Sequence, residues 1–216
     1  DVAAYERATS VYFPDRAVHM FPEELSTGIC SLKPKVDRLV QSCLMEIDAR
    51  GKVVRYEIQD GVIRSDARMT YTEVNAILVE RNAQTRNAYA ELVELFDRMK
   101  DLFEVLSDRR HRRGSIDFDL PSAEFLMDDA GQVTGIVAAE RNQAHRIIEE
   151  FMLAANTAVA TKLQDQELLF LRRIHPDPDF NKLRQLVATG CPGQLDLADS
   201  NDSSRSVSGC LNVVLI

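Results

Sequence analysis

The chain has 216 residues, of which 45% are hydrophobic and 28% are charged, so it can bury a sizeable core like an ordinary globular protein. Its 34 acidic residues outnumber its 26 Lys and Arg residues, which gives a formal net charge of −8. A protein that coats nucleic acid without sequence preference is normally basic, so this charge balance disfavours that class but allows a local basic channel.

The cysteines and the apolar runs indicate the compartment. Cys30, Cys43, Cys191 and Cys210 form no C-x-x-C pair and lie at no zinc-finger spacing from a histidine. We therefore expect a reduced, cytoplasmic protein. No membrane span is expected, because the sequence contains no apolar run of about 18 residues, and the start does not resemble a signal peptide. Since residue 1 is Asp rather than Met, the chain is interpreted as a fragment or a processed product.

Two β-hairpins are predicted, each built from two strand-like runs around a turn that contains Gly and charged residues. Apolar and polar residues alternate along the strands of the first hairpin, as expected for half-buried strands. The paired runs are Leu39–Ile47 with Val53–Ile63, and Ala123–Met127 with Val133–Ala138. Further short strands are expected at 9–13 and 168–174.

Two long amphipathic helices are predicted from apolar residues that recur three and four positions apart. The first spans 87–106, and its expected core stripe is Leu92, Leu95, Phe96, Met99 and Phe103. The second spans 142–163, and its expected core stripe is Ile147, Ile148, Met152, Ala155 and Val159. Shorter helices are expected at 73–79, with Thr72 as the N-cap, and at 178–187.

Strands and helices in this order predict an α+β fold, with a mixed, mostly antiparallel sheet and long packing helices. Residues 1–187 are expected to form one domain or part of one. Residues 188–216 are rich in Gly, Ser and Asp and show no hydrophobic period. This segment is predicted to be an atypical, disordered tail.

A cluster of basic residues ends the first long helix. Four arginines and one histidine occupy 109–113, and Gly114 and a strand around Phe118 follow. Arginines neutralise phosphates and an aromatic ring offers a stacking face for any base, so the segment suits a nucleic-acid strand. Arginines in the last turn of a helix also favour its dipole, so the same residues are typical of an ordinary helix end.

Acidic and aromatic residues supply further candidates. Asp117 and Asp119 project from the same face of the predicted strand, so they either share a metal ion or form a solvated edge.

Three aromatic residues lie where a strand-like run meets a turn or a helix start: Tyr12, Tyr71 and Phe118. Side chains at such places commonly line clefts, although core packing or a capping hydroxyl is the simpler role for any one of them.

Glu149 and Glu150 lie among the apolar residues of the second long helix, so one of them must lie close to the buried stripe. A partly buried carboxylate needs a partner, either an arginine such as Arg146 or a ligand hydroxyl. A surface ion pair with Arg146 is the alternative. The four histidines show no spacing that indicates a catalytic triad.

Many separated segments agree in order and spacing with one known family. The segments that carry this agreement are Arg7–Arg16, Pro22–Ser26, Asp37–Leu39, Gly61–Ser65, Met69–Tyr71, Arg112–Pro121 and His145–Met152. Together they resemble the catalytic (RNB) domain of the ribonuclease II/ribonuclease R family, with details that are more similar to bacterial ribonuclease R. The resemblance extends from Asp1 to about Leu186, and the chain is expected to be part of an RNB-type catalytic domain.

The resemblance implies a 3′-to-5′ exoribonuclease that hydrolyses single-stranded RNA to nucleoside 5′-monophosphates with Mg²⁺. In the family, residues matching Tyr12 and Phe118 sandwich the terminal bases. Residues matching Tyr71 and Glu149 contact the end nucleotides and favour RNA over DNA. Arg112 and Arg113 are included among the expected RNA-binding residues because they belong to the basic cluster, whose arginines either neutralise phosphates or only close the helix.

The family's metal-binding aspartates are expected upstream of this chain, and its catalytic arginine downstream. The chain is therefore expected to hold no catalytic residue and no metal ligand and to be inactive alone. A monomer is the default expectation, although the sequence itself does not determine the oligomeric state. A non-catalytic module that binds single-stranded RNA is the alternative function, and an α+β domain whose arginines only close a helix is the third.

Overall fold

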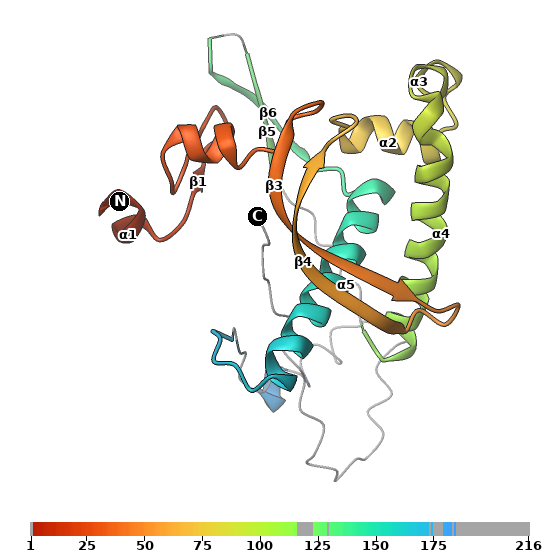
Figure 1. Cartoon of the computed structure of the whole chain (residues 1–216). Helices are drawn as coiled ribbons and strands as arrows, with labels where there is room; N and C mark the ends of the chain where they lie inside the picture. The colour runs from red at the N-terminus through yellow and green to blue at the C-terminus, as the bar shows by residue number, and fades with distance from the viewer. Residues whose placement is uncertain are drawn as a thin grey trace.

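The computed structural model describes residues 2–115, 123–128, 130–172, 174, 179–182 and 184. Its helices and antiparallel strand pairs confirm the α+β class (Figure 1). Instead of one larger sheet, the described strands form separate two-stranded sheets, because each pairs with its neighbour in sequence. The pairs are β1 (Val11–Tyr12) with β2 (Ala17–Val18), β3 (Asp37–Ile47) with β4 (Val53–Arg64), and β5 (Ala123–Met127) with β6 (Val133–Ala138).

Two helices of 23 residues each, α4 (Ala90–Arg112) and α5 (Gln143–Asp165), dominate the fold. The shorter helical elements are α1 (Val2–Arg7), the π-helix η1 (Glu24–Ile29), α2 (Tyr71–Leu78) and α3 (Ala83–Ala88), and residues 180–182 and 184, within the helix predicted at 178–187, are also helical. The single helix predicted from residue 87 is wrong at its start, because Tyr89 has the non-helical backbone angles φ −121° and ψ 36° and separates α3 from α4. Within the described segments, no helix is both long and apolar enough to cross a membrane.

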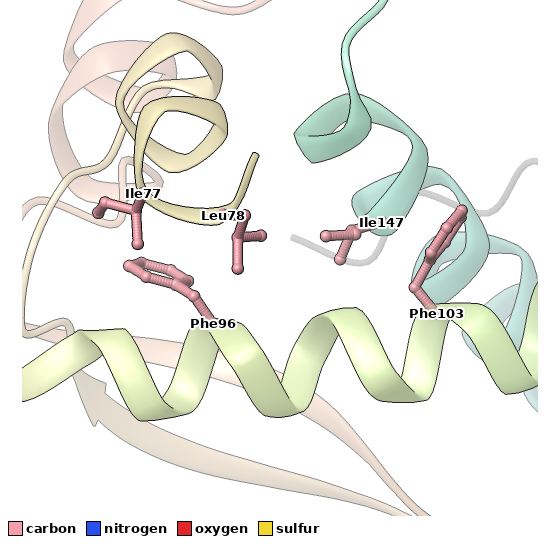
Figure 2. Close-up of a cluster of buried hydrophobic side chains, with 5 residues drawn as sticks. All are labelled: Ile77, Leu78, Phe96, Phe103 and Ile147. Carbon is pink, nitrogen blue, oxygen red and sulfur yellow. The ribbon is translucent and has the colours of Figure 1, made fainter. Parts of the chain in front are cut away.

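The hydrophobic core lies where α2 and α5 pack on one side of α4. Figure 2 shows Ile77 and Leu78 of α2, Phe96 and Phe103 of α4, and Ile147 of α5 facing one another. Ile77 is 0% exposed and Ile147 is 2% exposed. Burying side chains of this size contributes about 1.5–3 kcal/mol each, so the cluster holds the three helices together.

Some residues of the predicted core stripes face outward. Leu95 is 53% exposed, Ile148 is 45% exposed and Met152 is 42% exposed, so their assignment to the core is wrong. Periodicity identifies an apolar stripe, but the neighbouring element decides which edge of that stripe is covered. The strand predicted at 168–174 is also wrong for its described residues, which have no regular structure. Residues 188–216 lie outside the described part of the chain.

An ion pair with little solvent access connects α4 and α5. Arg110 Nε donates to Glu150 Oε1 at 2.6 Å, and the two side chains are only 16% and 6% exposed. Arg110 Nη1 also donates to Ser115 Oγ at 2.7 Å, just beyond the end of α4. Because the Glu150 carboxylate is largely removed from water, it depends on Arg110 for compensation.

The turn of the β3–β4 hairpin lies against the C-terminal part of α4. Arg109 Nη1 donates to the Gly51 carbonyl oxygen at 2.6 Å. Within the turn, Asp48 Oδ1 accepts from the backbone N–H groups of Arg50 and Lys52. The N–H of Lys52 is the main cause of a lowered pKa for the Asp48 carboxyl. Gly51 has a φ of +76°, and a Cβ there would lie 2.9 Å from the Val105 carbonyl oxygen.

Gly51→Ala should therefore lower the free energy of unfolding by more than Gly131→Ala. Both glycines have a φ of +76°, but a Cβ at Gly131 would have no neighbour within 4 Å. The left-handed backbone alone accounts for about 1–2 kcal/mol in either variant. Urea unfolding measures the loss in free energy of unfolding for each variant. The larger loss expected for Gly51→Ala is the part due to the contact with α4. Equal losses would show that the turn does not lie close to the helix.

Arg110→Ala should lower the free energy of unfolding by about 3–5 kcal/mol, because it leaves the Glu150 carboxylate buried without its partner. The double variant Arg110→Met/Glu150→Leu should lose much less, since it removes both charges. Arg112→Ala is the matched control, because its ion pair with Asp108 is exposed and such pairs contribute at most about 1 kcal/mol. Equal urea midpoints for Arg110→Ala and Arg112→Ala would contradict the account.

Candidate nucleic-acid interface

The N-terminus of α2 fixes the position of Tyr71, its first residue. Thr70 is the N-cap in place of the predicted Thr72, because its backbone is extended and its Oγ1 accepts from the Glu73 N–H at 3.2 Å. Glu73 Oε2 accepts in return from the Thr70 N–H at 2.9 Å, which completes a capping box. The Tyr89 hydroxyl donates to Glu73 Oε1 at 2.9 Å. The Thr70 N–H is the main cause of a lowered Glu73 pKa, and Glu73 raises the pKa of Tyr89.

The N-terminus of α5 meets Tyr71 through a histidine. The rings of Tyr71 and His145 are stacked, with centroids 3.8 Å apart and an angle of 23° between their planes. Tyr71 nevertheless remains 46% exposed. Sequence reasoning missed His145 because it considered only catalytic spacings. The available signal was that His145 lies four residues before Glu149, which places both on one face of a helix.

Glu149 and Glu150 take different partners, each of them an arginine other than Arg146, which the sequence offered as one example. Glu150 is the buried carboxylate, and Arg110 of the neighbouring helix compensates it. Glu149 is half-exposed, and its Oε2 accepts from Arg141 Nη2 at 2.6 Å. The guanidinium of Arg146 instead lies over the Phe103 ring, 5.5 Å from its centroid. Glu149 is therefore the more exposed member of the pair, and it lies one helical turn after His145 on α5.

The basic cluster that ends α4 has largely structural contacts. Arg109 binds the β3–β4 turn, Arg110 binds Glu150, and Arg112 pairs with Asp108 one turn earlier. Arg113 is the C-cap residue, and its N–H donates to carbonyl oxygens of the last turn. Arg109 and Arg110 thus hold the fold. Arg112 has an exposed side chain, so binding of a nucleic-acid strand stays a prediction for that part of the cluster.

The remaining aromatic candidates lie elsewhere. Tyr12 is 77% exposed on the short strand β1. Figure 1 places β1, the strand of Tyr12, and α2, the helix of Tyr71, on opposite sides of the β3–β4 hairpin. Phe118, together with Asp117 and Asp119, lies outside the described residues. From the predicted set, the described structure connects Tyr71 with α5 through the stack on His145, which lies one turn before Glu149.

The described residues do not fit a Mg²⁺ site. Among them, no three His, Cys, Asp or Glu side chains are grouped so that they could hold a metal ion. Two carboxylates of α2 and α5 are already engaged within the chain: Glu73 caps α2, and Glu149 pairs with Arg141.

Comparison with known proteins identifies relatives along most of the chain. Ribonuclease R of Aquifex aeolicus is 44% identical over 187 residues, which cover 87% of this chain and 26% of that protein. Ribonuclease R of Escherichia coli is 39% identical over 201 residues, covering 93% of this chain and 25% of that protein. Ribonuclease R 2 of Lactococcus lactis is 38% identical over 211 residues, covering 96% and 31%. The chain thus spans about a quarter to a third of these relatives.

Solved structures show the same fold. Mycoplasma genitalium RNase R in complex with ribose-methylated single-stranded RNA aligns with a TM-score of 0.75 and 28% identity, covering 88% of this chain and 29% of that one. Yeast Ssd1, described as a pseudonuclease, aligns with a TM-score of 0.61 over 85% of this chain and 22% of that one. At 13% identity, this alignment shows the fold alone.

The RNB domain matches residues 1–210, which include most of the segment 188–216 that the sequence pattern sets apart. Because this match covers nearly the whole sequence, the chain belongs to the RNB domain family.

Proposed function

We propose that the full-length protein carrying this chain is a 3′-to-5′ exoribonuclease that hydrolyses single-stranded RNA to nucleoside 5′-monophosphates. The observation that carries the proposal is the junction of α2 and α5, where the half-exposed Tyr71 stacks on His145, one helical turn before Glu149. The relatives named ribonuclease R, at 38–44% identity, and the RNA-bound neighbour at 28% identity support it. The ligand of the interface is accordingly the end of an RNA strand.

Tyr71 and Glu149 have complementary chemistry for a terminal ribonucleotide. One face of the Tyr71 ring lies against His145, so the opposite face is the one that can pack on a sugar or a base. Glu149 Oε2 is held by Arg141, and the other carboxylate oxygen makes no hydrogen bond to the described part of the chain. That oxygen can accept a hydrogen bond from a ribose 2′-hydroxyl, which DNA lacks.

The other predicted contacts belong to the same proposal. Tyr12 and Phe118 sandwich stacked bases, while Arg112 and Arg113 neutralise phosphates of the strand. Mg²⁺ is held by carboxylates outside this chain, as hydrolysis of a phosphodiester by metal ions requires. The protein acts as a cytoplasmic monomer on single-stranded RNA, and residues 1–187 supply part of its RNA channel.

A labelled RNA tests the reaction directly. The full-length protein is incubated with a 5′-labelled single-stranded RNA, with Mg²⁺ and, in a parallel sample, with EDTA. We expect progressive shortening from the 3′ end and release of nucleoside 5′-monophosphates only with Mg²⁺, and salt-sensitive binding in both samples. Binding without shortening would support a non-catalytic RNA-binding module instead. Absence of binding would contradict both functions.

Glu149→Gln should reduce the preference for RNA over DNA. It weakens the proposed acceptor for the 2′-hydroxyl, and a hydrogen bond to a charged group contributes about 1.5–3 kcal/mol, so RNA affinity should fall about tenfold or more. Affinity for DNA of the same sequence should not change. Glu104→Gln, which alters an exposed glutamate paired with Lys100 on α4, is the matched control. If Glu149→Gln left the RNA-to-DNA ratio unchanged, Glu149 would not read the sugar.

Phe118→Ala should weaken the binding of the RNA end by about 1–3 kcal/mol, because it removes one stacking surface. Phe118→Tyr keeps an aromatic ring and should retain most of the affinity. Fluorescence anisotropy with a short labelled RNA in EDTA measures both variants. Equal affinities for the Ala variant and the unaltered protein would exclude Phe118 from base stacking.

A further inference from the structure

His145 lies between the two helices that carry the proposed RNA contacts. It belongs to the first turn of α5, its ring stacks on Tyr71 of α2, and Glu149 follows it by one helical turn. Residues four apart on a helix are neighbours on one face, so His145 and Glu149 face the same side of α5. The position of the Tyr71 ring relative to Glu149 therefore depends on the His145 ring.

The imidazole of His145 is itself held by the N-cap of α5. Asn142 Oδ1 accepts from the backbone N–H groups of Ala144 at 3.1 Å and His145 at 3.4 Å, which identifies it as the amide oxygen. His145 Nδ1 lies 2.9 Å from the same oxygen. Because this oxygen can only accept, Nδ1 must carry the hydrogen. The capping side chain thus fixes both the tautomer and the orientation of the ring.

The Tyr71 ring is constrained from two directions. The capping box of Thr70 and Glu73 fixes its backbone, and the His145 ring covers one of its faces. The remaining 46% exposure leaves an aromatic surface whose plane is already set before a ligand arrives. Fixing a contact group in its bound orientation lowers the entropic cost of binding, so such a surface binds more tightly than a freely rotating ring.

We propose that His145 is a positioning residue for RNA: held by Asn142, it sets the plane of Tyr71 so that the terminal ribonucleotide packs on the opposite face of that ring. This inference rests on the proposed function. His145 acts through Tyr71 and does not itself touch the RNA. Its contribution is therefore lost whenever the Tyr71 ring is absent.

Variants at position 145 separate the stack from the hydrogen bond. His145→Phe keeps an aromatic face against Tyr71 but cannot donate to Asn142, whereas His145→Gln can donate but cannot stack. Loss of the stack releases the Tyr71 ring, so it should weaken RNA binding about three- to tenfold. We expect this loss for His145→Ala and His145→Gln, and an affinity within about twofold of the unaltered protein for His145→Phe.

A double-mutant cycle in the full-length protein provides the decisive measurement. The dissociation constant for a labelled single-stranded RNA is measured in EDTA for His145→Ala, Tyr71→Ala and the combined variant. We expect the combined variant to bind no more weakly than Tyr71→Ala alone, which shows that His145 acts through the ring. Thr157→Ala, an exposed substitution three turns further along α5, should leave the affinity unchanged, and urea midpoints check that each variant is folded.

Different results would overturn different claims. If His145→Ala also weakened binding in the Tyr71→Ala background, His145 would contact the RNA directly and would not be a positioning residue. If Tyr71→Ala weakened binding but His145→Ala did not, the positioning claim alone would fail and the proposed interface would stand. If the unaltered protein bound no RNA, the proposed function itself would fail.

Discussion

The ion pair between Arg110 and Glu150 fixes the distance and rotation between the two long helices. Its donor and acceptor are 2.6 Å apart and largely closed to solvent, so α4 and α5 cannot slide past each other without exposing or isolating a charge. The residue before Glu150 is Glu149, which faces the solvent beside His145. Glu150 therefore belongs to the buried α4–α5 contact, and its neighbour Glu149 belongs to the proposed interface. Any change in the α4–α5 contact would move the groups that are proposed to meet RNA.

The basic cluster shows how one stretch of sequence can serve two purposes. Dense arginine next to an aromatic residue suggests a nucleic-acid strand, yet Arg109 and Arg110 are used to bind the β3–β4 turn and α5. Arg112 and Arg113, at the end of the helix, remain the proposed phosphate contacts. The interface proposed for the RNA end lies where α2 and α5 begin, and Arg110 is connected to it through Glu150, the neighbour of Glu149.

Local patterns predicted much of the fold, because hairpin pairing and helical periodicity depend on neighbours in sequence. The β3–β4 and β5–β6 hairpins and the long helix α5 lie where alternation and spacing placed them. Contacts between residues far apart in sequence could not be predicted in this way. Which side of α5 is covered, and hence why Met152 is exposed, depends on α4 and α2. The same holds for Arg110 as partner of Glu150 and for the stack of His145 on Tyr71, since neither pair is close in sequence.

The fold by itself does not decide whether the protein cleaves RNA, since yeast Ssd1, described as a pseudonuclease, shares it. The central claim is that the RNA end is held where α2 and α5 begin. A crystal structure of the full-length protein with a short single-stranded RNA, grown without divalent cations, tests this most directly. The account predicts the terminal ribose on the face of Tyr71 opposite His145, with its 2′-hydroxyl bonded to Glu149. An RNA end bound away from both helix N-termini would contradict it.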